Sequence, residues 1–362
     1  MKITEIWVNK KNFRETKVVC KDAPQLDEGC IRVRIDKFAL TSNNVSYAVS
    51  GELFKYWQFY PTGMDEKWGN VTVWGMADVI ESSHNDISVG ERINGFFPMA
   101  SHTDLQIGKA KDQFLIDTSE HRLSLPPLYN NYPRCQSEPE MMKMLEIERC
   151  VLFPLYMTGY VLADFAQCND YFEAEQIIVG SVSSKTGYST AAFLRENGYK
   201  GKVVGLTSPR NIEFVRSLEV CDELITYADV EQIQKIPSLY LDMSGNKGVI
   251  SALHNHLKND IKSSQLVGAT HWDSTQFEYK LPGPKPELYF TPTHAEKRAK
   301  ELGAAVFIQQ NFMASAQLSI KLKSLLKNEF HRGTEQAISI WEGLLDNKVD
   351  GQRGIMISLN ED

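Results

Sequence analysis

The sequence predicts an α/β protein in which a mainly antiparallel β unit precedes a doubly wound parallel sheet. Two observations support this prediction. Apolar and polar residues alternate before about residue 150, and after it apolar strands alternate with helices at intervals of roughly 25 residues. The length of 362 residues allows two or three domains.

Strand-like segments dominate the first 150 residues. The segment CIRVRIDKFAL (30–40) alternates as a half-buried strand does, and VTVWGMADVIES (71–82) and GERINGFFPM (90–99) repeat the pattern with glycines. The segment from Asp117 to Met144 is rich in Pro, Tyr and Asn, so we expect a long excursion over the surface or over a cleft.

Five short apolar runs after residue 151 predict parallel strands: QIIVGSV, GKVVGLTS, ELITY, SLYLDMS and SQLVGAT. Helical stretches lie between them, including TGYSTAAFLREN, which Gly198 ends, and NIEFVRSLEV, which follows Ser208 and Pro209. This alternation is typical of a doubly wound sheet.

The tail after about Asn311 is predicted to form a helix (SAQLSIKLKSLLKN), a second helix (TEQAISIWEGLLDN) and a last strand (GIMISL). It is too small to fold alone. We therefore assign residues 1–150 with 311–362 to the first domain and residues 151–310 to the second.

Composition excludes several classes of function. The formal net charge is −7 and the pI about 5.7, so no global field attracts nucleic acid or an anionic membrane. The longest uncharged stretch, Cys150 to Ala163, contains Pro154 and is shorter than the ~18 apolar residues of a membrane span. The charged start of the chain does not resemble a secretory signal, and the six cysteines form no C-x-x-C pair, so we expect a cytoplasmic protein with reduced thiols.

The segment QIIVGSVSSKTGYSTAAFLRE predicts a phosphate-binding turn between an apolar strand and a helix. Free N–H groups and the helix dipole hold a phosphate at the first such turn of a doubly wound sheet. Lys185 supports this prediction, because a cation at the positive end of a helix is unfavourable unless an anion accompanies it. Hydroxyls that also suit the anion belong to Ser181, Ser183, Ser184 and Thr186. The alternative is a serine-capped helix with a solvated lysine.

Neither standard nucleotide motif is complete in this turn. A P-loop needs one more residue between Gly180 and Lys185, and a glycine where a serine stands. The dinucleotide fingerprint G-x-G-x-x-G is also absent, and only Gly187 occupies one of its glycine positions, the one that packs helix on strand.

The end of the second predicted strand favours NADP over NAD. An NAD site has Asp or Glu there, ~20 residues after the glycine turn, to hold the ribose 2′-hydroxyl. Thr207 stands at that position, and Ser208, Arg210 and Asn211 follow it. A guanidinium suits a 2′-phosphate, although Pro209 and Arg210 would equally open a surface helix. We add Gly268, in SQLVGAT, to the nucleotide-binding set.

No pattern indicates a metal or a hydrolase. None of the eight histidines pairs with a cysteine at zinc-site spacing, and no G-x-S-x-G elbow occurs. His254 and His256 are two residues apart on a predicted helix and so point to different faces, and we expect them at the surface.

The whole pattern resembles the medium-chain dehydrogenase/reductase superfamily, in its zinc-free quinone oxidoreductase-like branch, and more closely the DUF2855 family within it. The segments that carry the resemblance are ALTSNNVSYAVSGE (39–52), FKYWQFYP, WGNVTVWG, GERINGFFPMASH, HRLSLPPLYNNY, FPLYMTGY and SVSSKTGYSTAAF. The resemblance implies a GroES-like β domain, a Rossmann domain with a doubly wound parallel sheet, and a C-terminal return to the first domain.

The resemblance also implies particular site residues. Thr158 would lie by the nicotinamide, and SVSSKTG would replace the superfamily's glycine-rich turn, with Ser184 and Lys185 at two glycine positions. The catalytic-zinc cysteine position falls in TSNNVSY, which has no cysteine, so zinc chemistry is not carried over.

The reaction that fits is NADPH-dependent reduction of an enone or quinone without a metal, in which a donor stabilises the negative charge on the substrate oxygen. We predict Tyr47, Asn43 and Asn44 as the catalytic residues, although asparagines also serve turns. Secondary candidates for the cleft wall are Tyr129, Asn130, His271 and Trp272, while Trp57, Tyr60, Trp68 and Trp74 suit packing equally well.

Two alternatives remain open: a non-catalytic NADP(H)-binding redox sensor or interaction protein, and, less favoured, a P-loop enzyme. The expected partner is a small-molecule substrate, with no nucleic acid and no membrane. The oligomeric state is open, a homodimer included.

Overall fold

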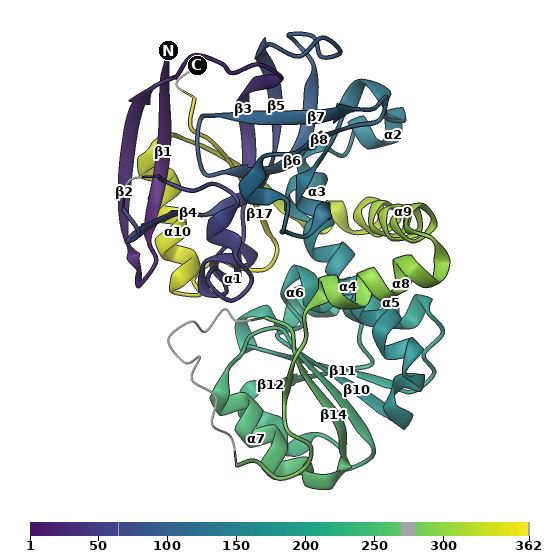
Figure 1. Ribbon diagram of the computed structural model, residues 1–362. Coiled ribbons are helices and arrows are strands. Elements are labelled where there is room, and N and C mark those ends of the chain that lie inside the picture. The colour runs from purple at the N-terminus through teal and green to yellow at the C-terminus, as the bar shows by residue number, and fades with distance from the viewer. Residues whose placement is uncertain (64, 269–279, 361–362) are drawn as a thin grey trace. The chain divides into compact units, whose positions relative to one another are not determined.

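The computed structural model describes residues 1–63, 65–268 and 280–360 (Figure 1). The chain divides into two compact units. The first comprises Met1–Val151, Asn328–Val349 and Arg353–Asp362, and the second comprises Leu152–Lys327 and Asp350–Gln352.

The second division differs from the sequence prediction, which placed it at residue 311. Residue 311 lies inside a long helix, α9 (Ala304–Leu322), and this helix packs on α4 (Phe153–Cys168) of the second unit. Asn311 is buried there and donates from Nδ2 to the Met157 carbonyl at 3.3 Å. A helix is one packing element, so the boundary falls after it.

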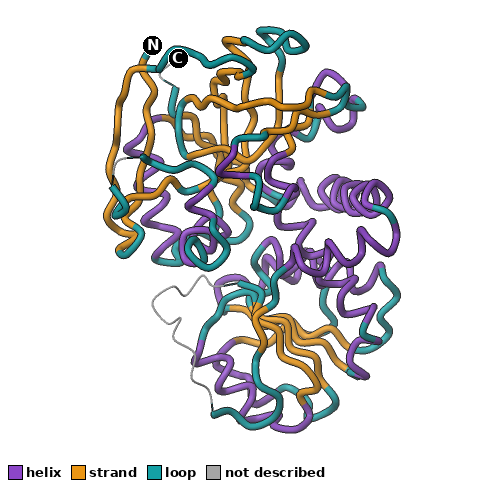
Figure 2. Tube along the Cα trace, in the orientation of Figure 1, coloured by secondary structure: helices purple, strands orange, loops and turns teal. Residues whose placement is uncertain are grey.

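The first unit is built mainly from antiparallel strands, which Figure 2 shows in orange. Its strands are β1 (Lys2–Asn9), β2 (Asn12–Asp22), β3 (Cys30–Leu40), β4 (Trp68–Asn70), β5 (Thr72–Ser82), β6 (Arg92–Pro98), β7 (His102–Ala110), β8 (Phe114–Asp117), β9 (Asn131–Pro133), β16 (Lys327–Arg332) and β17 (Arg353–Ser358). Its helices are α1 (Ser42–Val49), α2 (Glu140–Lys143), α3 (Glu146–Val151) and α10 (Gly333–Leu345).

The largest sheet of this unit follows the order β16-β17-β3-β7-β8-β9, with β5 paired to both β3 and β6. The returning strand β17 pairs antiparallel with β3, so the C-terminal residues complete the sheet that the N-terminal residues begin. Three apolar residues of this strand are buried: Ile355, Met356 and Ile357. The free energy of burying them stabilises the return of the C-terminal segment to the first unit.

The second unit is a parallel sheet covered by helices. Its strands are β10 (Gln176–Gly180), β11 (Lys202–Thr207), β12 (Glu223–Thr226), β13 (Ser238–Asp242), β14 (Ile261–Leu266) and β15 (Glu287–Leu288). Besides α4 and α9, its helices are α5 (Lys185–Glu196), α6 (Ile212–Leu218), α7 (Lys247–Leu257) and α8 (Thr291–Leu302).

The strand order β12-β11-β10-β13-β14-β15 makes β10 the point where the winding reverses. The chain moves from β10 to β11 and β12 on one side, then crosses to β13 on the other. All these pairings are parallel, and Gly180 at the end of β10 is in register with Leu206 and Asp242. Ligands of such sheets bind at the carboxyl ends of the strands beside the reversal, here β10 and β13.

Most elements agree with the sequence prediction within one to three residues. The exceptions are the fifth predicted parallel strand, SQLVGAT, which begins earlier, at Ile261, and the predicted helix 315–328. That segment instead forms the end of α9, a short turn and the start of β16. Among the described residues, no helix is long and apolar enough to cross a membrane.

Candidate functional site

The turn between β10 and α5 is folded by its own small residues. Ser181 has a φ of 53°, in the left-handed region, which lets the chain reverse directly after the strand. Ser184 is the N-cap of α5, and its hydroxyl accepts from the Gly187 N–H at 3.1 Å. This contact is the serine cap that the sequence analysis gave as its alternative, so Ser184 has a structural role in the turn.

Two glycines let the strand, the turn and the helix approach closely. A Cβ at Gly187 would lie 2.6 Å from the Ser181 carbonyl oxygen and 2.8 Å from the Val182 Cα. A Cβ at Gly180 would lie 2.8 Å from an Asp242 carboxylate oxygen. Gly187 therefore has the helix-on-strand packing role that its place in the partial fingerprint indicates.

The start of α5 suits a phosphate. The N–H groups of the first turn of a helix have no partner within the helix, and the dipole makes this end positive. No acidic residue lies in the first turn, which holds Lys185, Thr186 and Gly187. These features fit an anion at the reversal of the sheet.

Hydroxyl and amide groups join this turn to the end of β11. The Ser183 hydroxyl accepts from Thr207 Oγ1 at 3.0 Å and from Asn211 Nδ2 at 3.1 Å, and Asn211 Nδ2 also lies 3.1 Å from Ser208 Oγ. The structure thus brings together three of the predicted nucleotide-binding residues, Ser183, Ser208 and Asn211. Thr207, which stands where an NAD site would have Asp or Glu, is buried.

Lys185 is buried, with a residue exposure of 7%. Its Nζ donates to the Gly351 carbonyl at 2.9 Å. The alternative of a solvated lysine is therefore wrong. Its ammonium lies in the protein interior at the start of α5, where its charge is costly unless oxygen atoms surround it.

Arg210 lies in the short turn before α6 and is exposed, its side chain by 52%. Its guanidinium is thus exposed beyond the end of β11, on the segment that also carries Ser208 and Asn211.

The other predicted nucleotide-binding residues lie on neighbouring elements. Thr158 is on α4, where its hydroxyl donates to the Pro154 carbonyl at 3.0 Å. Gly268 follows β14, and a Cβ there would lie 2.0 Å from the Met243 carbonyl oxygen, so only glycine fits. His271 and Trp272 lie outside the described residues.

Sequence reasoning missed two residues at this edge of the sheet. Asp242 ends β13, is fully buried, and accepts from the Tyr240 hydroxyl at 3.1 Å and from the Gly245 N–H at 2.6 Å. Burial raises the pKa of this carboxyl. The hydrogen-bond donors around it favour its charged form and oppose this shift, but burial has the larger effect. Tyr227 begins a short helix (Tyr227–Gln232) after β12 and hydrogen-bonds Ser181, while burial raises the pKa of its hydroxyl. Asp242 ends β13 and Tyr227 follows β12, so both lie at the carboxyl ends of predicted strands.

Tyr47 is on α1 of the first unit, in a buried aromatic cluster. Its hydroxyl oxygen accepts from Trp74 Nε1 at 3.1 Å, and Asn43 also hydrogen-bonds it. Burial raises the pKa of this phenol far above its usual range. Tyr47 therefore stays protonated and is suited to donate a hydrogen bond, not to act as a base.

Asn44 has a structural position. Its side chain accepts from the Thr41 N–H at 2.7 Å, in a capping box at the start of α1, and donates to the Thr72 carbonyl at 2.8 Å. Both ends of the amide are thus bound to backbone in a buried site, which is the turn role that asparagine often has. Asn43, one residue earlier, is half-buried and directed to Tyr47.

The cluster around Tyr47 contains residues far apart in the sequence: Tyr47, Tyr56, Phe59, Phe96, Leu125 and Tyr129. The Tyr129 hydroxyl lies 3.0 Å from that of Tyr56, whose ring centroid is 4.5 Å from that of Tyr47. Asn130 is buried beside it and donates to the Arg122 carbonyl at 3.2 Å. The segment after Asp117 therefore contributes Leu125 and Tyr129 to this buried cluster.

Trp57 has a packing role. A Cβ at Gly51 would lie 2.1 Å from its indole Nε1, and a Cβ at Gly69 would lie 2.4 Å from its Cε3, so the two glycines hold the indole between them. Trp74 differs, because its indole N–H contacts the candidate catalytic phenol.

A comparison with protein-family models shows which family the chain belongs to. The family described as "Protein of unknown function (DUF2855)" matches residues 38–350. The chain belongs to the DUF2855 family. A comparison of the sequence with curated proteins finds no match.

Solved structures share the fold of this DUF2855 protein over almost its full length. CurA from Vibrio vulnificus in complex with NADPH is 15% identical, with a TM-score of 0.63, and covers 99% of this chain and 100% of its own. The quinone oxidoreductase from Coxiella burnetii is 13% identical, with a TM-score of 0.54 and coverage of 99% and 100%. The yhdH oxidoreductase from Salmonella enterica in complex with NADP is 12% identical, with a TM-score of 0.54 and the same coverage.

These similarities confirm the predicted fold class, a GroES-like antiparallel domain and a Rossmann domain.

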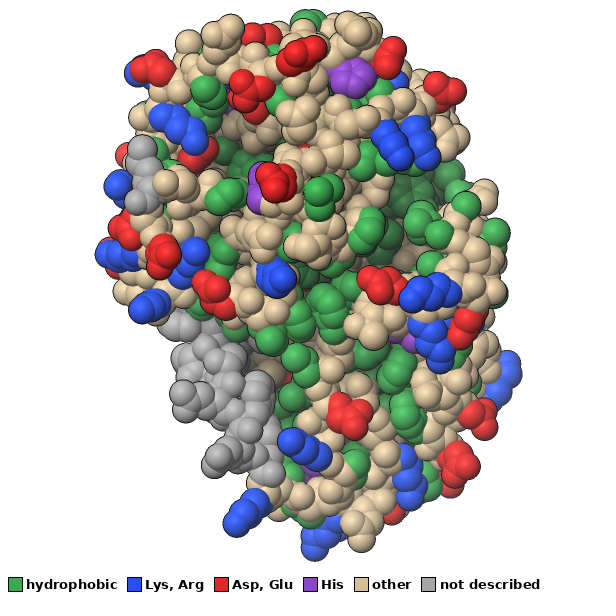
Figure 3. Space-filling view, viewed as in Figure 1, with side chains coloured by type: hydrophobic (Ala, Val, Ile, Leu, Met, Phe, Trp, Pro, Cys, Tyr) green, Lys and Arg blue, Asp and Glu red, His purple; other side chains and the backbone are tan. Residues whose placement is uncertain are grey.

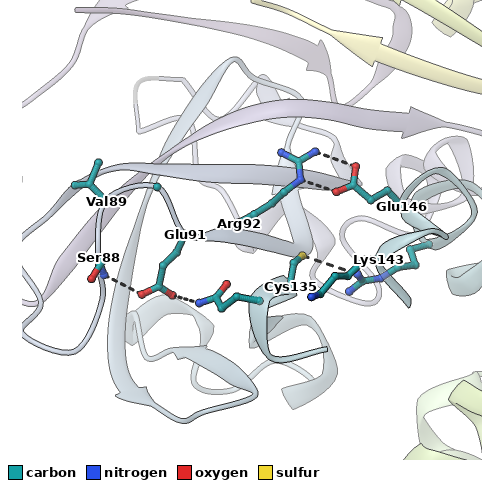
Figure 4. Close-up of a pocket in the computed structure, with 10 residues that line it drawn as sticks. Ser88, Val89, Glu91, Arg92, Cys135, Lys143 and Glu146 are labelled. Carbon is teal, nitrogen blue, oxygen red and sulfur yellow. Dashed lines mark hydrogen bonds and ion pairs between the residues drawn. The ribbon is translucent and has the colours of Figure 1, made fainter. Parts of the chain in front are cut away.

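A cavity of about 580 Å³ in the first unit of the DUF2855 protein is a second candidate site (Figure 4). Its charges are paired within the protein: Arg92 contacts Glu146, Asp36 and Asp78, and Arg149 contacts Glu138. Burial would raise the pKa of Glu146, but the hydrogen bonds from Arg92 and Lys37 lower it to about 2.

Cys135, which also lines this cavity, does not make it catalytic. Burial raises the pKa of its thiol to about 11, so the thiol is a poor nucleophile. In this cavity the charges of Arg92, Glu146 and Arg149 are thus paired, and the Cys135 thiol stays protonated.

One group in the second unit has metal-ligand chemistry: Asp164, Cys168 and His294 have donor atoms within 4.8 Å of one another. His294 Nε2 hydrogen-bonds Asp164 Oδ2 at 2.7 Å, and Arg298 Nε forms an ion pair with the same oxygen at 2.9 Å. A metal would have to displace the Arg298 guanidinium, so the group is better described as an ion-pair network between α4 and α8.

The expectation that His254 is at the surface is wrong. It is fully buried on α7, and its ring contacts the Pro282 carbonyl and the Ser264 hydroxyl, each at 3.0 Å. The helix face that carries His254 packs on the sheet, which the two-residue spacing alone does not reveal.

Proposed function

We propose that this protein is an NADPH-dependent oxidoreductase that reduces an activated double bond, of the enone or quinone type, without a metal. The observation that carries the proposal is the turn at the reversal of the parallel sheet. It contains the N-terminus of α5 with the buried Lys185, and its Ser183 hydrogen-bonds Thr207 and Asn211 at the end of β11. The bound nucleotides named for two structures of the same fold, NADPH and NADP, support this choice of cofactor.

The nucleotide is assigned to the second unit. The N–H groups at the start of α5 and the ammonium of Lys185 would hold its diphosphate, and Arg210 with Ser208 and Asn211 would hold its 2′-phosphate. Thr158 and Gly268 complete the set. When bound, NADPH supplies a hydride; the tasks of the protein are to hold it, exclude water and stabilise the charge that develops on the substrate.

The stabilisation of charge is assigned to Tyr47. Because Trp74 donates to its oxygen and burial keeps its proton in place, the phenol is prepared to donate to a substrate oxygen that becomes negative. Asn43 positions the phenol, and Asn44 fixes the start of the helix that carries both.

A small molecule is the proposed substrate. On the face shown in Figure 3, acidic and basic side chains are interspersed, and no single-sign patch dominates it. This distribution, with the net charge of −7, gives that face no attraction for nucleic acid or an anionic membrane.

We expect NADPH to bind more tightly than NADH, and the Arg210→Ala variant to lose much of this preference. A charged hydrogen bond to phosphate is worth about a tenfold change in affinity at a half-exposed site. Isothermal calorimetry with both nucleotides measures it. Arg216→Ala is the matched control, because Arg216 is an exposed arginine on α6 that pairs with Glu213.

Equal affinities of the wild type, or an unchanged preference in Arg210→Ala, would contradict the assignment of the 2′-phosphate to this residue. Tight NADPH binding without turnover across a panel of enones, quinones and aldehydes would instead favour the sensor alternative. The position of Asn44 agrees with that alternative. Both ends of its side-chain amide hydrogen-bond the backbone, so it is not placed to take part in a reaction.

A further inference from the structure

The segment Asp350–Gln352 lies against the candidate nucleotide turn. It belongs to the second unit, although the residues before and after it belong to the first. The Gly351 carbonyl accepts from Lys185 Nζ at 2.9 Å, and the Gln352 carbonyl accepts from the Lys327 N–H at 2.8 Å. A Cβ at Gly351 would lie 2.0 Å from the Ser183 carbonyl oxygen, so only glycine allows this approach.

Asp350, the first residue of this segment, places its carboxylate next to Arg210. Its Oδ1 lies 3.6 Å from Arg210 Nε, and the two side chains are 42% and 52% exposed. The distance is that of a charge pair and is longer than a hydrogen bond. Arg210 is the cation assigned above to the 2′-phosphate, so the carboxylate stands next to the position that the phosphate would take.

This acid has the chemistry that sequence reasoning sought and did not find at Thr207. A carboxylate at this place in a dinucleotide site accepts from the ribose 2′-hydroxyl and repels a 2′-phosphate. The protein has Thr207 at the end of β11, and the tail brings Asp350 to Arg210 from more than a hundred residues further along the chain. The two side chains therefore act in opposite directions on the same part of the ligand.

We propose that Asp350 is a specificity-determining residue that narrows the preference of the site for NADPH over NADH. It does so by neutralising Arg210 and by repelling the 2′-phosphate, which carries a charge of about −1.5 to −2 near neutral pH. The inference rests on the proposed function and adds a residue to the same site.

Asp350→Asn tests the proposal, since it removes the charge and keeps the shape. We expect the variant to bind NADPH about three- to tenfold more tightly and NADH no more tightly than the wild type does, so that the ratio of the two affinities rises. The gain should shrink as salt is added, because the pair is exposed. In an Arg210→Ala background the Asp350→Asn substitution should increase the affinity for NADPH less, because that variant has no guanidinium for Asp350 to neutralise.

Glu213→Gln is the matched control. It removes the same charge from an exposed acid that follows Arg210 closely in the sequence, but Glu213 pairs with Arg216. Melting temperatures of all variants show whether they fold.

Three outcomes would overturn the proposal. An unchanged affinity ratio in Asp350→Asn means that Asp350 has no effect on specificity, and an equal loss for both nucleotides means that it only holds the tail. If the wild type binds neither nucleotide, the proposed function fails together with this inference, whereas binding with an unchanged ratio refutes the inference alone.

Discussion

Replacement of Tyr47 by Phe is expected to lower turnover by about 10²–10³-fold, the usual effect of removing one donor to a developing oxyanion. The affinity for NADPH should stay nearly the same, since the residues assigned to the nucleotide belong to the other unit. A steady-state assay of NADPH oxidation with an enone or quinone found by screening gives the turnover, and calorimetry gives the affinity.

Tyr56→Phe is the control for this prediction. Tyr56 is a buried phenol of the same cluster, bonded to Tyr129, and we assign it no role in the reaction. Asn43→Ala should reduce turnover through the position of the phenol. Asn44→Ala should act mainly on stability, because it removes two buried hydrogen bonds to backbone. If turnover is found and is indifferent to Tyr47→Phe, the reacting groups lie elsewhere, and Tyr129 with Asn130 are the next candidates.

Substitution of Lys185 by Ala should weaken NADPH binding about ten- to a hundredfold, since a charged hydrogen bond to the diphosphate is lost. The structure adds a second effect. Because Lys185 is buried and donates to Gly351, the variant should also melt at a lower temperature without any ligand. From the sequence alone, with the lysine taken as exposed to solvent, a change in affinity without a change in stability would be expected.

Lys185→Met separates the two effects, because it keeps the length of the side chain and removes the charge. Calorimetry and thermal unfolding are measured on both variants. Lower melting temperatures with an intact NADPH affinity would show that Lys185 only fastens the C-terminal segment to the turn, and the phosphate assignment would then be withdrawn.

The order of elements could be predicted from the sequence because local patterns determine it. CIRVRIDKFAL alternates apolar and polar residues, the pattern of a strand with one buried face. QIIVG is an almost unbroken apolar run, the pattern of a strand buried on both faces. The same dependence on local pattern explains the difference at the end of α9. The apolar period of the sequence continues through Leu325 and Leu326, and only tertiary pairing converts the next residues into β16.

The site could be predicted only where its residues are adjacent in the sequence. The turn of Ser181 to Gly187 and the group at Ser208 to Asn211 each follow one strand, so one local rule finds both. Asp350 reaches Arg210 through the return of the tail, and Trp74 reaches Tyr47 through the packing of α1 on β5. These contacts depend on tertiary structure, and no local pattern contains them.

A crystal structure of the protein grown with NADPH tests the central claim most directly. The account predicts the diphosphate at the start of α5, within hydrogen-bond distance of the Lys185 and Thr186 N–H groups, and the 2′-phosphate against Arg210. Nucleotide density that lies away from this turn, or crystals grown at saturating NADPH in which the turn binds nothing, would contradict the account.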